Sequence, residues 1–225
     1  HCVASGLSDP SLEALVSAKR GADLDFLRED VVALLAESRD GLNRVRKIVN
    51  DLKDFSHVGE VVWQEADLNA GLESTLNGVW SELKYKAEMI KDYGELPRVR
   101  CVPAQINQVL MNLLVNAAQA IEVRGTITLS SRAEGDRVWI EIADTGKGMS
   151  PEIQKRIFEP FFTTKPVGQG TGLGLSVSYD IINKHGGHFD LSSTLGKGSS
   201  FRFWLPVAGP VGKEGPRVQP NPNPT

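Results

Sequence analysis

The chain of 225 residues has few cysteines, no long apolar run and no excess of basic charge. Its two cysteines, Cys2 and Cys101, are too few for a disulfide framework or a zinc site, so we expect reduced thiols. The apolar runs are interrupted well before the roughly 20 residues that a membrane span needs, and the first residues do not form a secretion signal. A net charge of −3 offers no basic surface for nucleic acid. We therefore expect a cytoplasmic protein, with no nucleic-acid partner and no membrane contact from this chain.

Hydrophobic residues make up 40% of the chain and charged residues 24%, which is ordinary for a globular protein with a real core. The length exceeds that of a typical domain, so we expect one compact domain and an additional segment. The pattern predicts a linker or frayed segment over 1–21, a helix within 22–58, a folded domain over 59–207 and a Pro-rich disordered tail over 208–225.

A long helix is predicted by the stretch from residue 22 to 56, which has no proline and a single glycine, Gly41. Apolar residues recur there at steps of three and four, the mark of a coiled-coil-like seam. Acidic residues precede basic ones, which suits the helix dipole. A lone helix cannot bury such a seam, so a partner helix is needed. The seam consists of Leu24, Leu27, Val31, Leu34, Leu42, Val45, Val49, Leu52 and Phe55.

Residues 61–207 combine helical and strand patterns. We expect helices over 68–87, 103–123, 152–157 and 174–185, and strands over 61–66, 89–92, 98–102, 126–132, 137–143, 188–193 and 199–206.

The helix expected from Pro103 carries a second, uncharged polar stripe beside its apolar face. Solvated helix faces usually carry Lys and Glu, so an amide stripe also fits a cavity that meets a hydrated cation or phosphate oxygens. The stripe alone leaves both interpretations open. Its members, at steps of three and four, are Gln105, Gln108, Asn112, Asn116 and Gln119.

Glycine-rich segments follow. In residues 144–149, Asp144 directly follows an expected strand. Its carboxylate could accept a hydrogen bond from a ligand, and the glycines would let the backbone come close to that ligand. A turn capped by Asp would have the same sequence pattern. Residues 168–175 open a helix, whose free N–H groups suit an anion, although the spacing is not that of a Walker loop. Residues 196–201 join the last two strands and also fit a plain hairpin. Between the first two segments, residues 158–165 form an aromatic cluster that ends in Thr-Thr-Lys.

The ordered combination of these five motifs is far more specific than any one of them. It resembles the N, G1, F, G2 and G3 boxes of the histidine kinase ATP-binding domain, whose Bergerat fold is shared with gyrase, the ninety-kilodalton heat-shock chaperone and mismatch-repair ATPases. The resemblance covers residues 61–207. Residues 44–57 also resemble the second helix of the dimerisation and phosphotransfer hairpin of nitrogen-regulator-type sensor kinases. This implies an α+β fold: a two-layer α/β sandwich, with a mixed sheet and helices on one face, preceded by the long helix.

The resemblance implies ATP and Mg²⁺ as ligands and assigns roles to matching residues. Asp144 would accept from the adenine amine, Asn116 would ligate Mg²⁺, and residues 158–172 would form a lid. The implied catalytic residues are Asn112 and Lys165. The implied nucleotide-binding residues are Asn112, Asn116, Gln119, Asp144, Gly146, Gly148, Met149, Lys165, Gly170, Thr171, Gly172, Leu173, Gly174, Leu175 and Ser199.

Two departures from the family pattern stand out. Gln119 occupies a position where many sensor kinases carry Lys, so more phosphate charge would rest on Lys165 and the metal. The family's phosphoacceptor is a His followed by an acidic residue and later a Pro, and none of the four histidines fits: His1, His57, His185 or His188. We therefore expect the acceptor helix to be missing and this chain alone not to autophosphorylate.

The implied function is phosphorylation of a histidine on that missing helix, for transfer to an aspartate of a response regulator. The implied partners are a second copy, through the 22–58 helix, and the receiver domain of the regulator. The whole protein could be a membrane-anchored sensor of which this is the cytoplasmic part. One alternative is a hydrolytic ATPase of the same fold, whose general base is a Glu where this chain has Asn112. The other is a non-catalytic dimerisation module with a decayed site, against which the intact motifs argue.

Overall fold

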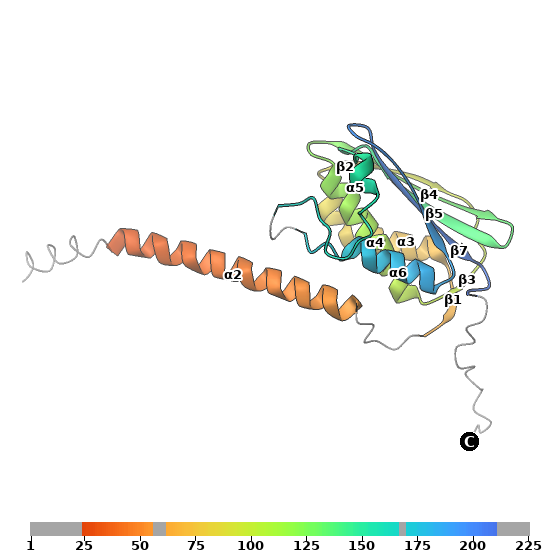
Figure 1. Cartoon of the computed structure of the whole chain (residues 1–225), viewed down its shortest axis with the longest axis horizontal. Helices are drawn as coiled ribbons and strands as arrows, with labels where there is room; N and C mark the ends of the chain where they lie inside the picture. The colour runs from red at the N-terminus through yellow and green to blue at the C-terminus, as the bar shows by residue number, and fades with distance from the viewer. Residues whose placement is uncertain (1–23, 56–61, 167–169, 211–225) are drawn as a thin grey trace, which may run out of the picture. The chain divides into compact units, whose positions relative to one another are not determined.

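The computed structural model describes residues 24–55, 62–166 and 170–210 (Figure 1). The chain divides into two units, residues 1–50 and 51–225. The expected linker over 1–21 and all but the first three residues of the expected tail lie outside the described residues.

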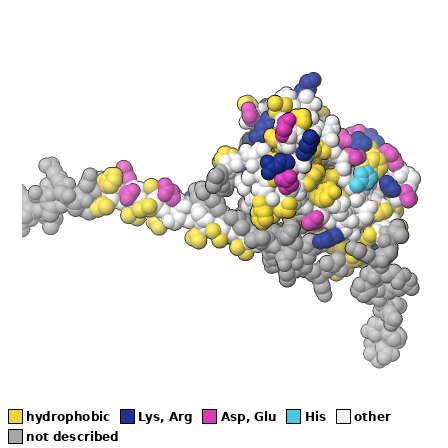
Figure 2. All heavy atoms as spheres, in the orientation of Figure 1, with side chains coloured by type: hydrophobic (Ala, Val, Ile, Leu, Met, Phe, Trp, Pro, Cys, Tyr) yellow, Lys and Arg dark blue, Asp and Glu magenta, His cyan; other side chains and the backbone are white. Residues whose placement is uncertain are grey.

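The long helix α2 runs over Leu24–Phe55, within a residue or two of the expected limits. Its 32 residues make it about 48 Å long, at about 1.5 Å per residue. The seam positions whose side chains the structure describes are exposed, with Leu27, Val31 and Leu42 at 47%, 51% and 71%. Figure 2 shows hydrophobic side chains at the surface along this helix. An apolar stripe of this length predicts a helical partner.

A five-stranded mixed sheet forms one layer of the second unit, in the order β2-β4-β5-β7-β6. Strands β2 and β4 pair in parallel, and the remaining pairs are antiparallel. Strands β1 and β3 form a separate two-stranded antiparallel sheet. The strands are β1 Gln64–Ala66, β2 Ala87–Tyr93, β3 Val99–Cys101, β4 Gly125–Glu134, β5 Arg137–Asp144, β6 His188–Thr194 and β7 Gly198–Pro206.

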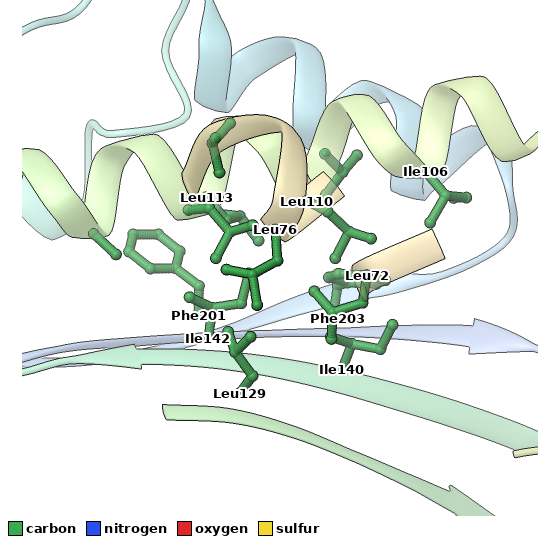
Figure 3. Close-up of a cluster of buried hydrophobic side chains, with 14 of the residues drawn as sticks. Leu72, Leu76, Ile106, Leu110, Leu113, Leu129, Ile140, Ile142, Phe201 and Phe203 are labelled. Atoms are coloured by element: carbon green, nitrogen blue, oxygen red, sulfur yellow. The ribbon is translucent and has the colours of Figure 1, made fainter. Parts of the chain in front are cut away.

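Helices form the other layer, on one face of the sheet (Figure 1). They are α3 Leu68–Leu83, α4 Pro103–Ala120 and α6 Gly174–Lys184, with the single-turn α5 at Pro151–Gln154. The core lies between the layers, where leucines of α3 and α4 meet the inward side chains of the central strands (Figure 3). The predicted two-layer α+β sandwich is thus confirmed.

Three predicted helix ends are wrong. Helix α3 ends at Leu83 instead of residue 87, because a turn that Lys86 N–H closes on the Leu83 carbonyl (2.8 Å) leads directly into β2. Helix α4 ends at Ala120 instead of 123, because Ile121 is extended and buried in the core. Helix α5 spans only Pro151–Gln154, whereas the sequence predicted 152–157; its start is capped by Ser150.

Candidate functional site

The carboxylate of Asp144 lies at the end of β5 and is 7% exposed. One oxygen accepts from the Gly146 N–H at 2.8 Å, and the backbone N–H of Ser199, its partner in β7, also donates to it. Burial raises the pKa of Asp144, and the two N–H groups act in the opposite direction. A buried acceptor held in this way at a strand end is suited to reading a hydrogen-bond donor of a ligand.

The turn after Asp144 requires glycine at its tightest point. Gly148 has φ +63°, and a Cβ on it would lie 2.0 Å from the carbonyl oxygen of Thr194. The Lys147 carbonyl accepts from Gly196 N–H at 2.7 Å. Two of the glycine-rich segments, 144–149 and 196–201, therefore pack against each other.

Two polar side chains that the sequence did not single out, Ser193 and Gln154, hydrogen-bond across this contact. The Ser193 hydroxyl accepts from Met149 N–H at 2.9 Å and lies 3.0 Å from the Ser199 hydroxyl. Gln154 Nε2 donates to the carbonyls of Met149 and Ser193, both at 3.0 Å. Neither residue lies in a recognisable motif, and the two are 39 positions apart, so only the folded chain shows the link.

The amide stripe of α4 meets the lid segment through a cation. Lys165 Nζ donates to Asn116 Oδ1 at 3.1 Å and also to Gln119 Oε1. Two features that the sequence singled out separately, the amide stripe and the lysine that ends the aromatic segment, are thus brought together. Since both amide oxygens already face a positive charge, this donor set fits Mg²⁺, which prefers oxygen ligands and keeps several waters.

Asn112 lies one turn earlier on α4 and contacts the start of α6. Its Nδ2 donates to the Gly174 carbonyl at 3.0 Å and to the Ser178 hydroxyl at 3.2 Å. The side chain of Leu173 is 1% exposed, and Leu175 packs against the core, so these two predicted ligand residues offer mainly backbone. The part that Asn112 would play toward a metal stays a prediction.

The lid segment 158–172 is described except for residues 167–169. The Phe158 ring packs at 5.0 Å from Tyr179 and 5.5 Å from Phe189. At the other end, Phe161 N–H donates to the Gly172 carbonyl at 3.0 Å, and both residues have positive φ, 67° and 69°. A left-handed Phe is strained backbone, which often marks ligand-binding segments. The start of the lid is therefore packed against α6 and β6, and its two ends are hydrogen-bonded to each other.

Among the described residues, no group of three or more His, Cys, Asp or Glu side chains could hold a metal ion. No helix in the described part of the chain is long and apolar enough to cross a membrane.

The sheet, its covering helices and the site residues together define the fold class of this domain. A mixed sheet covered on one face by α3, α4 and α6, with a strand-end aspartate and glycine turns beside an amide helix, is the Bergerat ATP-binding fold. Residues 101–209 match the family model described as "Histidine kinase-, DNA gyrase B-, and HSP90-like ATPase".

Sensor histidine kinases are among the relatives with the most similar sequences. The chain is 38% identical over 181 residues to sensor histidine kinase ZraS of Salmonella typhi, covering 79% of this chain and 38% of the relative. It is 34% identical over 203 residues to AtoS of Escherichia coli (strain K12), covering 88% and 32%. The chain therefore spans well under half the length of the curated relatives that it matches.

Solved structures agree with this relationship. The nucleotide-free catalytic domain of histidine kinase ThkA matches with TM-score 0.60 and 31% identity, over 65% of this chain and 97% of that one. Full-length ShkA in complex with AMPPNP matches with TM-score 0.67 and 29% identity, over 80% and 39%. ThkA in complex with response regulator protein TrrA matches with TM-score 0.64 and 27% identity, over 76% and 49%. The chain belongs to the histidine kinase ATP-binding catalytic domain family, and its likeness to the nitrogen-regulator subgroup stays a prediction.

Proposed function

We propose that this chain binds Mg-ATP between α4, the end of β5 and the turn that opens α6, and donates the terminal phosphoryl group to a histidine of a sensor kinase. The observation that carries the proposal is that α4 of a histidine kinase fold contacts both the lid and the turn after Asp144: Lys165 Nζ donates to Asn116 Oδ1 at 3.1 Å, and Lys147 N–H donates to the Ala120 carbonyl at 3.0 Å. Asp144, Asn116 and Lys165 would each contribute a different contact: a base-reading acceptor, a metal ligand and a phosphate cation.

The chemistry asked of these residues is mainly positioning and charge stabilisation. Asp144 would hold the adenine amine, and Lys165 would move from the amide oxygens of α4 to the phosphates when the nucleotide enters. Mg²⁺, held by Asn116 and the phosphates, would neutralise charge on the phosphoryl group. The free N–H groups at the start of α6 would face the same anion.

The identity of residue 112 favours phosphoryl transfer over hydrolysis. Hydrolases of this fold would need a proton acceptor there to activate water. Asn112 takes up no proton, and its Nδ2 donates to Gly174 and Ser178. Water would therefore be a poor competitor for the phosphoryl group.

The uncovered seam of α2 supports two partners. Apolar positions from Leu27 to Val49 leave a stripe that we propose is covered by the acceptor helix and by the same helix of a second copy, giving a homodimer. A receiver domain of a response regulator would then take the phosphoryl group, as the neighbouring structure of ThkA with TrrA suggests.

Calorimetric titration with a non-hydrolysable ATP analogue, with and without Mg²⁺, tests nucleotide binding. The chain should bind the analogue, and Mg²⁺ should tighten binding. Asn116→Ala should remove most of that tightening, whereas Gln105→Ala, on the same stripe but about three turns earlier, should leave it unchanged. Full Mg²⁺ dependence in Asn116→Ala would place the metal ligand elsewhere.

A further inference from the structure

A buried histidine outside the proposed nucleotide contacts joins the two helices that the proposed function places beside the nucleotide. His185 follows the last residue of α6 and is 1% exposed. Its Nε2 accepts from the backbone N–H of Val102 at 3.0 Å, and Val102 is the residue that precedes α4. Its Nδ1 lies 2.8 Å from the Ile181 carbonyl. One ring therefore connects the end of α6 with the beginning of α4.

The two contacts determine the form of the ring. Because a backbone N–H donates to Nε2, that nitrogen carries the lone pair and the proton is on Nδ1. Nδ1–H then donates to the Ile181 carbonyl, which also accepts from the His185 backbone N–H at 3.1 Å. The ring of Trp63 packs against it at 4.7 Å. The neutral imidazole is thus fully hydrogen-bonded and enclosed.

A second connection joins the same helices at the ligand end. Asn112 of α4 donates to the Gly174 carbonyl and the Ser178 hydroxyl at the start of α6. Since Val102 meets the end of α6 while Asn112 meets its beginning, the helices run antiparallel. Val102 and Asn112 are about 15 Å apart along α4, and Gly174 and His185 about 16 Å along α6, from the rise per residue. Two polar contacts with matching spacing hold the pair as one unit.

We propose that His185 is a positioning residue for the nucleotide site. While the His185 connection is intact, the position and angle of α6 relative to α4 are fixed. The first N–H groups of α6 then keep a fixed distance from the amide stripe. With the connection broken, α6 keeps the Asn112 contact and its packing in the core, but its far end loses a fixed position against the start of α4. This proposal rests on the proposed function, because it assumes that both helices face the nucleotide.

Two substitutions and a matched control test the proposal in the full chain. His185→Phe keeps a ring beside Trp63 but removes both hydrogen bonds, whereas His185→Gln keeps an oxygen that accepts from the Val102 N–H. His188→Phe is the control, since His188 is exposed and stacks on Trp204 at 5.7 Å on the sheet. His185→Phe should bind the Mg-ATP analogue about tenfold more weakly, equivalent to about 1.4 kcal/mol, at temperatures where it is fully folded. His185→Gln should recover most of the affinity, and His188→Phe should match the unmodified chain.

Hydrogen exchange separates positioning from general stability. His185→Phe should accelerate exchange of the amides at residues 175–178, at the opposite end of α6, more than it accelerates exchange in β4 and β5. Unchanged affinity together with unchanged exchange at 175–178 would reduce His185 to a structural residue and overturn the proposal. If the unmodified chain bound no nucleotide, the proposed function would fail, while exchange at 175–178 would still decide whether His185 couples the helices.

A measurement on the unmodified chain covers the case in which His185→Phe does not fold. Nitrogen chemical shifts of the ring report which nitrogen carries the proton. We expect the Nδ1–H form throughout neutral pH. A ring protonated at Nε2 could not accept from Val102 and would contradict the connection directly.

Discussion

Replacing Asp144 with Asn tests the nucleotide site at the residue with the most defined surroundings. The substitution is isosteric, so the Asn oxygen can still accept from the Gly146 N–H. The second carboxylate oxygen becomes an NH₂ group, which would face the adenine amine donor to donor. Losing a hydrogen bond to a charged group and leaving a donor unpaired costs about 1–3 kcal/mol. The dissociation constant should therefore rise by roughly 5- to 150-fold, at about 1.4 kcal/mol per factor of ten.

Folding stability should respond in a different way. The pKa of Asp144 is raised because burial disfavours its charge, so a neutral amide at the same place removes a desolvation cost. We expect the free energy of unfolding of Asp144→Asn to be equal to or higher than that of the unmodified chain. Weaker binding without loss of stability would exclude unfolding as the cause.

Calorimetry with the ATP analogue and chemical denaturation give the two quantities. Asp136→Asn is a suitable control, because the Asp136 side chain is 94% exposed in the turn between β4 and β5. It should change neither quantity. If Asp144→Asn bound the analogue with unchanged affinity, Asp144 would not contact the base, and the placement of the nucleotide would be wrong.

Three further predictions concern the lysine of the lid, the glycine at the end of the lid, and pH. Lys165→Met should weaken ATP binding more than ADP binding, because the ammonium is expected on the terminal phosphate; equal losses in calorimetry would contradict that role. Gly172→Ala should destabilise the lid by about 1–2 kcal/mol, since its φ of 69° is strained for alanine and a Cβ would lie 2.3 Å from the Phe161 carbonyl carbon; hydrogen exchange at 158–166 measures the effect. Burial lowers the pKa of His185, so the unfolded chain binds a proton first on acidification. Stability should fall below about pH 6.5, the ordinary His value, and this part of the fall should be absent in His185→Gln, as measured by denaturant titration across pH.

The periodic parts of the chain were predictable and the junctions were less so. Apolar periods of 3.6 and 2 located α3, α4, α6 and the central strands β4, β5 and β7, because each of these buries one face. The single-turn α5 and the strand β1 have no buried residue. The end of α3 at Leu83 was missed, because it depends on where β2 pairs with β4, which is a non-local contact.

For the site, individual residues were predictable from motifs, whereas the contacts between them were not. Asp144, Asn116 and Lys165 were identified from motifs, but the sequence had no way to show that Lys165 contacts Asn116 across 49 positions. Ser193 and Gln154 were missed because serine and glutamine are common on surfaces and become informative only through their partners. His185 was noted only for lacking the surroundings of a phosphoacceptor, since its function depends on the position of Val102.

Transfer of phosphate to a separate acceptor tests the central claim most directly. The full chain is incubated with Mg²⁺, ATP labelled at the terminal phosphate and a second fragment that carries a sensor-kinase acceptor helix. We predict acid-labile labelling of the histidine on the added fragment, little labelling of this chain alone, and loss of the signal in Asn116→Ala. Rapid release of inorganic phosphate at a rate independent of the fragment, or acid-labile labelling of this chain alone that disappears in His57→Ala, would contradict the account.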